Sequence, residues 1–268
     1  VKYKSSSEIT GKRDLIVGAD NSGVDIACDA SFAADQAFLS VRRGYHFVPK
    51  HLFGKPSDVF SEEGPKLPFF LQQKIFGGLL RLINGDLTSY GLPKPDHKIF
   101  QTHPIMNTQI LHYLGHGDCI AKGDIDYLDG KEVVFKDGSR EQIDLIITAT
   151  GYKHSVPFLN GEEIPIKNGR PDLYLNMFPR NCSNMALIGF IEFASAAYEN
   201  FDLMSELIVA DIAGSAEGLA EMKKTHHPDL SGGHNYLNTE RNANYVDVDT
   251  FLKTLSKVKA RTGIASGV

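Results

Sequence analysis

The sequence predicts an α/β protein built around a parallel sheet, and three observations lead to this prediction. An apolar strand pattern at residues 14–17 ends in a glycine turn. A helical pattern follows this turn, and a second strand pattern at residues 37–41 completes a βαβ unit. Much further along the chain, the apolar run from Ile143 to Ala149 has the length and composition of another buried strand.

Composition limits the classes of protein to which the chain can belong. With 268 residues, 42% of them hydrophobic and 23% charged, it has the balance of a globular protein with one large domain or two small ones. The net charge of -5 provides no general attraction for nucleic acid, so no nucleic-acid partner is expected. The three cysteines lack the spacing of a metal site or a disulfide framework, which predicts no metal and favours a reducing, cytoplasmic location.

The sequence also lacks a run of about 18 apolar residues and a charged-then-apolar leader. We therefore expect neither a membrane-spanning helix nor a signal peptide.

The first βαβ unit can be followed residue by residue. Its turn covers residues 18–23, and apolar residues then recur at helical spacing as far as Ala33 or Ala34. Ser22 is placed to cap the first turn of this helix. The second strand ends abruptly at the run Arg42-Arg43-Gly44.

Four segments follow before the third strand. Residues 45–67 carry prolines and glycines among aromatics and predict an irregular, partly packed loop. Residues 68–87 have the rhythm of one or two helices, with Gly77-Gly78 as a kink or a close-packing point. A further helical pattern runs through residues 105–114, and residues 120–144 predict a β-meander because two Asp-Gly pairs mark hairpin turns.

The second half of the chain is less regular. We expect a linking segment beyond residue 155, a strand at residues 185–188 and a helix at residues 201–213. A polar loop should cover residues 231–245, and a last helix should cover residues 248–258.

The strand, turn and helix of residues 14–30 match the pattern of a dinucleotide-binding site, in which N–H groups at a helix N-terminus receive a pyrophosphate. Asp20 replaces the middle glycine of this pattern and puts a carboxylate where the backbone should approach a dianionic group. About 20 residues after the turn, NAD proteins carry an acid for the ribose 2′-hydroxyl. This chain instead carries Arg42 and Arg43, which suit a 2′-phosphate and favour NADP; otherwise they form a solvated strand end.

Several stretches resemble the flavin-containing monooxygenase family. Residues 18–27 are similar to its GxGNSGxDIA motif, and residues 144–152 are similar to its D-x-I-I-x-A-T-G-Y segment. Shorter matches fall in the same order as in the family, at residues 91–97, 103–107, 173–178 and 187–190. The resemblance extends from about residue 1 to residue 213.

The resemblance implies a Rossmann-like NADP-binding domain at residues 9–154, with a helical insertion at about 60–115. Residues 155–268 would be the C-terminal portion of a FAD-binding domain. In the family, NADP(H) reduces FAD, and one oxygen atom from O2 enters a small organic substrate. The family's chain crosses between its two domains at Thr150-Gly151-Tyr152, where small residues would let a cofactor approach closely.

Besides Asp20, the sequence departs from the family in two further respects. It contains no FAD fingerprint, although Tyr3 matches the last residue of a signature that precedes the NADP turn in the family. Glu192 stands where the family often has Gln near the flavin ring. The missing FAD fingerprint, together with Asp20 in the glycine turn, leaves a second hypothesis, a truncated or degenerate chain without cofactor that acts as an interaction module. Any exposed apolar surface would favour a homo-oligomer.

The sequence singles out no catalytic residue and no metal ligand. For His103 with Asn107 we expect a helix-capping role, and for His112 with His116 we expect no zinc site, because no Glu follows as in HExxH. The His226-His227 pair should be an exposed loop pair. The predicted cofactor-binding residues are Gly18, Asp20, Asn21, Ser22, Gly23, Arg42, Arg43, Thr150, Gly151 and Tyr152.

Overall fold

A computed structural model gives two compact units. Unit 1 comprises Val1–Ile99 and Pro104–Tyr152, and unit 2 comprises Phe100–His103 and Lys153–Val268. The predicted domain boundary at residues 154 and 155 lies outside the described part of the chain. The structure describes residues 3–62, 67–152, 156–159, 164–167, 170–180, 182–193, 197–239, 242 and 244–264.

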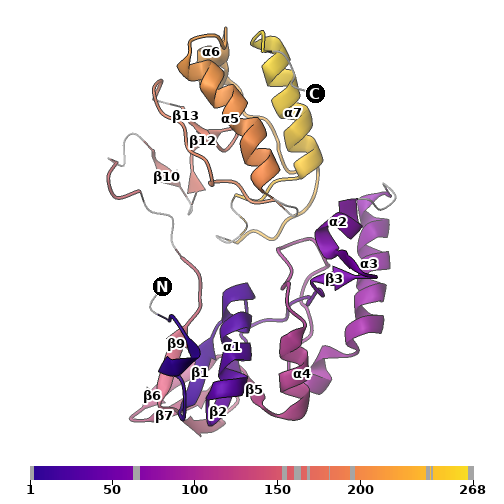
Figure 1. Cartoon of the computed structure of the whole chain (residues 1–268), viewed down its shortest axis with the longest axis vertical. Coiled ribbons are helices and arrows are strands. Elements are labelled where there is room, and N and C mark those ends of the chain that lie inside the picture. Colours follow the sequence, from indigo (N-terminus) through magenta and orange to yellow (C-terminus); the bar gives the residue numbers. More distant parts are fainter. Residues whose placement is uncertain are drawn as a thin grey trace. The chain divides into compact units, whose positions relative to one another are not determined.

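A four-stranded parallel sheet in the order β5-β2-β1-β9 forms the centre of unit 1 (Figure 1). The predicted α/β class with a parallel sheet is therefore confirmed. Val17 of β1 lies opposite both Ser40 of β2 and Thr148 of β9, so these three strands end at one edge. The strands are β1 (Arg13–Val17), β2 (Gln36–Ser40), β5 (Cys119–Lys122) and β9 (Leu145–Thr148).

Each face of this sheet is covered by a different layer. Alternate side chains of a strand point to opposite faces, so neighbouring residues of β1 contact different layers. Ile16 packs with α1 (Asn21–Ala33) and α4 (Gln109–His116). Leu15 packs with Phe38 and Val133 on the other face, where the sheet β6-β7-β8 lies. That antiparallel sheet consists of β6 (Ile125–Asp129), β7 (Glu132–Phe135) and β8 (Arg140–Gln142).

The predicted meander is thus correct for β6 to β8 and wrong for residues 120–122. These residues belong to β5, which pairs with β2 in the parallel sheet. Short strand patterns look alike in both settings, and only the partner strand separates them.

The segment between β2 and β5 has more regular structure than the sequence indicated. Residues 45–67 contain the hairpin of β3 (His51–Leu52) and β4 (Lys55–Pro56), followed by α2 (Ser57–Glu62). Of the one or two helices predicted at residues 68–87, the structure has one, α3 (Phe69–Asn84), which continues through both glycines. The described part of unit 1 also contains two short 3-10 helices, η1 (Ser6–Glu8) and η2 (Leu87–Tyr90).

The described residues of unit 2 form three α-helices and two short ribbons. The apolar faces of α5 (Tyr198–Ile212), α6 (Leu219–Thr225) and α7 (Val248–Arg261) share one buried cluster. Helices α5 and α7 run side by side in Figure 1. The two-stranded ribbons pair β10 (Ile166–Lys167) with β11 (Arg170–Pro171) and β12 (Leu173–Tyr174) with β13 (Phe178–Pro179).

Two helices that the sequence predicted in unit 2 are confirmed, α5 and α7, and α6 was not predicted. The predicted strand at residues 185–188 is wrong. Leu187 donates one backbone hydrogen bond to Met177, and no ladder forms there. In the part of the chain that the structure describes, each helix is too short or too polar to cross a bilayer.

Candidate functional site

The glycine turn joins β1 to α1 at the carboxyl edge of the sheet, and its two glycines are required for different reasons. Gly18 has a φ of +106°, and a Cβ atom there would lie 2.7 Å from the carbonyl oxygen of Ala149. A Cβ atom on Gly23 would lie 1.9 Å from the carbonyl oxygen of Gly18. The turn therefore packs against the end of β9 and against the first turn of α1.

Asp20 is the N-cap of α1, which corrects the prediction that Ser22 caps this helix. Its side-chain carboxylate accepts a hydrogen bond from the Asn21 N–H at 2.8 Å. A carboxylate is stabilising at this position because a helix N-terminus carries partial positive charge. Ser22 and Gly23 contribute first-turn N–H groups, which have no acceptor within the helix.

Asn21 and Asp25 attach the inserted segment to α1. The side-chain oxygen of Asn21 accepts from the Met106 N–H at 2.7 Å, and Asn107 donates from Nδ2 to Asp25 Oδ1 at 2.7 Å. The Asn107 side chain also accepts from the Gln109 N–H. Asn21 thus has a structural bond of its own beside its predicted role in the turn.

The predicted capping role of His103 with Asn107 is therefore wrong in detail: Thr108 is the N-cap of α4, and the Asn107 side chain bonds to the first N–H of the helix. Helix α4 begins at Gln109, five residues beyond the proline that suggested an earlier start. Ile105 instead pairs with Phe47 in an isolated bridge, which uses its backbone groups outside a helix.

Arg42 and Arg43 follow the end of β2, at the same edge as the glycine turn. Arg42 is exposed, whereas Arg43 is partly buried and donates from Nη2 to Asp96 Oδ1 at 2.8 Å. The Nε atom of Arg43 is buried and has no hydrogen-bond partner among the described residues. The structure thus brings both predicted arginines to the predicted edge and gives them different surroundings.

Tyr45 is a neighbour of this site that the sequence analysis did not single out. Burial is the main cause that raises the pKa of its hydroxyl, and the Asp20 carboxylate adds to the increase. The charges of Arg43 and Arg42 act in the opposite direction. Tyr45 therefore lies within electrostatic range of the cap and of both arginines. Its position in the sequence, directly after Arg42-Arg43-Gly44, is the one feature from which its place near the site could have been predicted.

The segment Thr150-Gly151-Tyr152 follows β9. The Thr150 N atom lies 3.5 Å from where a Cβ atom on Gly18 would stand, so this segment begins beside the glycine turn. Gly151 has a φ of +88°, and the Tyr152 side chain is 79% exposed.

None of the remaining histidine candidates forms a recognisable metal centre. The rings of His112 and His116 lie 4.1 Å apart on α4, and His116 Nδ1 is 2.9 Å from the His112 carbonyl oxygen. Among the described residues, no group of three or more His, Cys, Asp or Glu side chains is arranged to hold a metal ion.

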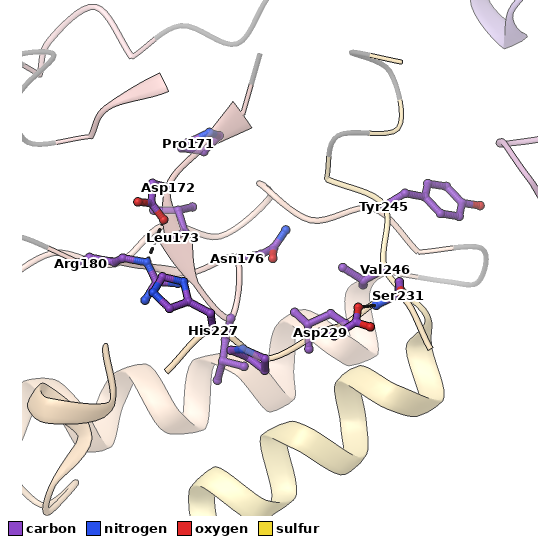
Figure 2. A pocket seen from close by; sticks show the side chains of 13 residues that line it. Pro171, Asp172, Leu173, Asn176, Arg180, His227, Asp229, Ser231, Tyr245 and Val246 are labelled. Atoms are coloured by element: carbon purple, nitrogen blue, oxygen red, sulfur yellow. Dashed lines mark hydrogen bonds and ion pairs between the residues drawn. The ribbon is translucent and has the colours of Figure 1, made fainter. Parts of the chain in front are cut away.

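Unit 2 contains a cavity of about 450 Å³ that the sequence did not indicate (Figure 2). Arg180 donates from Nε to Asp172 at 2.8 Å and from Nη1 to the carbonyl oxygens of Lys223 and His226. Asp229 accepts from the Ser231 N–H. The hydrogen bonds of Arg180 thus connect the segments on either side of the cavity. The cavity is lined by Pro171, Asp172, Leu173, Leu175, Asn176, Arg180, His227, Pro228, Asp229, Leu230, Ser231, Tyr245 and Val246.

Glu192 also lies in unit 2, where its backbone N–H donates to Asn244 and its carbonyl accepts from Val246. These bonds hold the backbone at Glu192 against the segment before α7.

A parallel sheet with a glycine turn between β1 and α1 defines a Rossmann-like fold. The family model described as "Flavin-binding monooxygenase-like" matches residues 1–227, and the chain belongs to this family. The family predicted from the sequence is thereby confirmed.

Individual relatives agree with this assignment. Flavin-containing monooxygenase 5 of Cavia porcellus is 31% identical over 282 residues, covering 98% of this chain and 50% of the relative. Probable indole-3-pyruvate monooxygenase YUCCA9 of Arabidopsis thaliana is 32% identical over 178 residues, covering 63% of this chain and 42% of the relative. The chain spans about half the length of the curated relatives it matches.

A solved structure shows the same fold. The S-allyl-L-cysteine S-oxygenase of Allium sativum matches with a TM-score of 0.52 at 15% identity, covering 99% of this chain and 48% of that protein. The second hypothesis, an interaction module without cofactor, has no support in these comparisons.

Proposed function

We propose that this chain is the NADPH-binding part of a flavin-dependent monooxygenase. The whole protein would reduce FAD with NADPH and transfer one oxygen atom from O2 to a small organic substrate. In this proposal unit 1 is the NADP-binding domain, and residues 155–268 belong to a FAD-binding domain. The observation that supports it best is the position of Arg42 and Arg43 beside the glycine turn, at one edge of the parallel sheet.

The residues at this edge suit the two charged parts of the nucleotide. Gly18 allows the tight turn, and the N–H groups of Ser22 and Gly23 at the N-terminus of α1 would receive the pyrophosphate. Arg42 and Arg43 would hold the 2′-phosphate. The buried Nε of Arg43 is a donor that a phosphate oxygen would satisfy. Asp20 and Asn21 would hold the turn in place through their hydrogen bonds to the Asn21 and Met106 N–H groups.

When bound, the nucleotide supplies a hydride, and the protein's part is to position it. Thr150, Gly151 and Tyr152 would border the nucleotide, because Thr150 begins beside Gly18. We include FAD because the chain belongs to the flavin-binding monooxygenase-like family. The buried free thiols of Cys28 and Cys119 favour the proposal of a reducing, cytoplasmic setting.

Calorimetric titration of the chain with NADPH and with NADH tests the proposal. We expect tighter binding of NADPH, and we expect Arg42→Ala to weaken it by about tenfold or more, because a hydrogen bond to a charged group is worth about 1.5–3 kcal/mol. Arg81→Ala is the matched control, since Arg81 is exposed on α3. The proposal fails if the chain binds neither nucleotide, or if Arg42→Ala and Arg81→Ala leave the same NADPH affinity.

A further inference from the structure

Acidic side chains offset the two arginines at the edge where the 2′-phosphate would bind. Asp96 contacts Arg43 directly, and Asp20 stands at the start of α1. Arg42 is one of the charges that lower the pKa of Asp124, after Lys136, which bonds to that carboxylate. The positive charge of the pair is therefore partly cancelled before any ligand arrives.

Asp96 is held in place by contacts on both sides. Its Oδ1 atom accepts from Arg43 Nη2 at 2.8 Å and lies 2.7 Å from His97 Nδ1. The His97 side chain is only 2% exposed. His46 donates from Nε2 to the His97 carbonyl oxygen at 2.8 Å, and the two rings meet edge to face. The Asp96 side chain itself is 51% exposed, so its charge stands at the surface.

The backbone on either side is equally constrained. Gly44 pairs with Pro95 in a parallel bridge, and a Cβ atom on Gly44 would lie 1.9 Å from the Lys94 carbonyl oxygen. The segment that carries Asp96 is thus packed directly against the segment that carries Arg43. A mobile surface acid could move away from an incoming phosphate, but this one is anchored.

Because Asp96 is anchored, it acts on Arg43 in two ways. The guanidinium binds phosphate best when two of its parallel N–H donors are available, and the carboxylate occupies Nη2. The carboxylate also repels a dianionic phosphate that approaches the same guanidinium. Bonds from Arg43 first, and from His97 next, lower the pKa of Asp96, so its charge is present at neutral pH.

We propose that Asp96 is a specificity-determining residue of the nucleotide site, whose carboxylate on Arg43 reduces the preference for NADPH over NADH. This inference rests on the proposed function. It predicts a site that accepts both nucleotides, in which Arg42 provides most of the discrimination. The contact between Asp96 and Arg43 could not be predicted from the glycine turn or the arginine pair, because Asp96 lies 53 residues beyond Arg43 in the chain.

The test is Asp96→Asn in the whole chain, titrated by calorimetry with NADPH, NADH, 2′,5′-ADP and AMP. Asparagine keeps a side-chain oxygen for Arg43 and removes the charge. We expect the Kd for NADPH and for 2′,5′-ADP to fall about tenfold, while the Kd for NADH and AMP stays within about twofold, as loss of one nearby repulsion predicts. Damage to the fold would weaken all four ligands alike.

Two further variants serve as controls. Asp96→Glu keeps the charge and should keep the wild-type ratio of the NADH and NADPH dissociation constants. Asp118→Asn makes the same charge change at the opposite edge of the sheet, before β5, and should leave that ratio unchanged.

The outcomes separate this inference from the function on which it rests. If the wild-type chain binds NADPH through Arg42 and Asp96→Asn leaves the ratio unchanged or lowers it, only the role of Asp96 is overturned. If neither the wild type nor Asp96→Asn binds any of the four ligands, both proposals are overturned.

Discussion

Replacement of Asp14 should stabilise unit 1, and the effect should depend on pH. Asp14 lies on β1 and is 0% exposed, and neither carboxylate oxygen has a hydrogen-bond partner among the described residues. Burial is the main cause that raises its pKa from 3.8 to about 6; nearby Lys12 acts against this shift, and Asp144 adds to it. Each pKa unit is worth about 1.4 kcal/mol, so the ionised carboxylate costs up to about 3 kcal/mol of stability.

The direction of the pH dependence follows from the raised pKa in the folded state. Between pH 3.8 and about 6 the folded protein keeps the proton on Asp14 and the unfolded chain releases it. The contribution of this group to stability is therefore intact below pH 3.8, is lost as the pH rises to about 6, and stays lost above that value. Asp14→Val should stabilise the protein at pH 8 by up to about 3 kcal/mol and by much less at pH 4.

Amide hydrogen exchange at β1, measured from pH 4 to pH 8, reports the stability of unit 1 itself. Asp126→Val is the matched control, because Asp126 is an exposed aspartate on β6 and its replacement should change stability by about 1 kcal/mol or less. A stability difference between wild type and Asp14→Val that does not change with pH, or a variant less stable than wild type at pH 8, would refute the reasoning.

Two further predictions concern the nucleotide edge. Gly44→Ala should destabilise the protein by about 2 kcal/mol or more in thermal unfolding, because the new Cβ atom would lie 1.9 Å from a backbone oxygen. Gly77→Ala, on α3 with no atom within 4 Å of the new Cβ, should instead stabilise by about 0.5–1 kcal/mol, and equal effects of the two changes would contradict this packing. Asp20→Ser keeps a capping oxygen at the start of α1 and removes its charge, so the melting temperature should hold while calorimetry shows tighter NADPH binding; weaker binding would mean that the carboxylate assists the nucleotide.

Local patterns predicted the parts of the fold that depend on neighbours in sequence. The turn at residues 18–23 and the helix after it were visible because glycine freedom and helical periodicity act over a few residues. The apolar run at residues 185–188 was misread as a strand, because a strand exists only where a partner supplies its ladder. The partner of residues 119–122 was missed for the same reason.

The candidate site divides in the same way. The sequence by itself determined the glycine turn and the arginines at the end of β2, since both follow from the order of residues within one βαβ unit. Only the tertiary structure decided which arginine is exposed and which is held by Asp96, and that Tyr45 lies near Asp20. Charge interactions act through space, and the inserted segment brings an acid from far along the chain to the arginine that it partly neutralises.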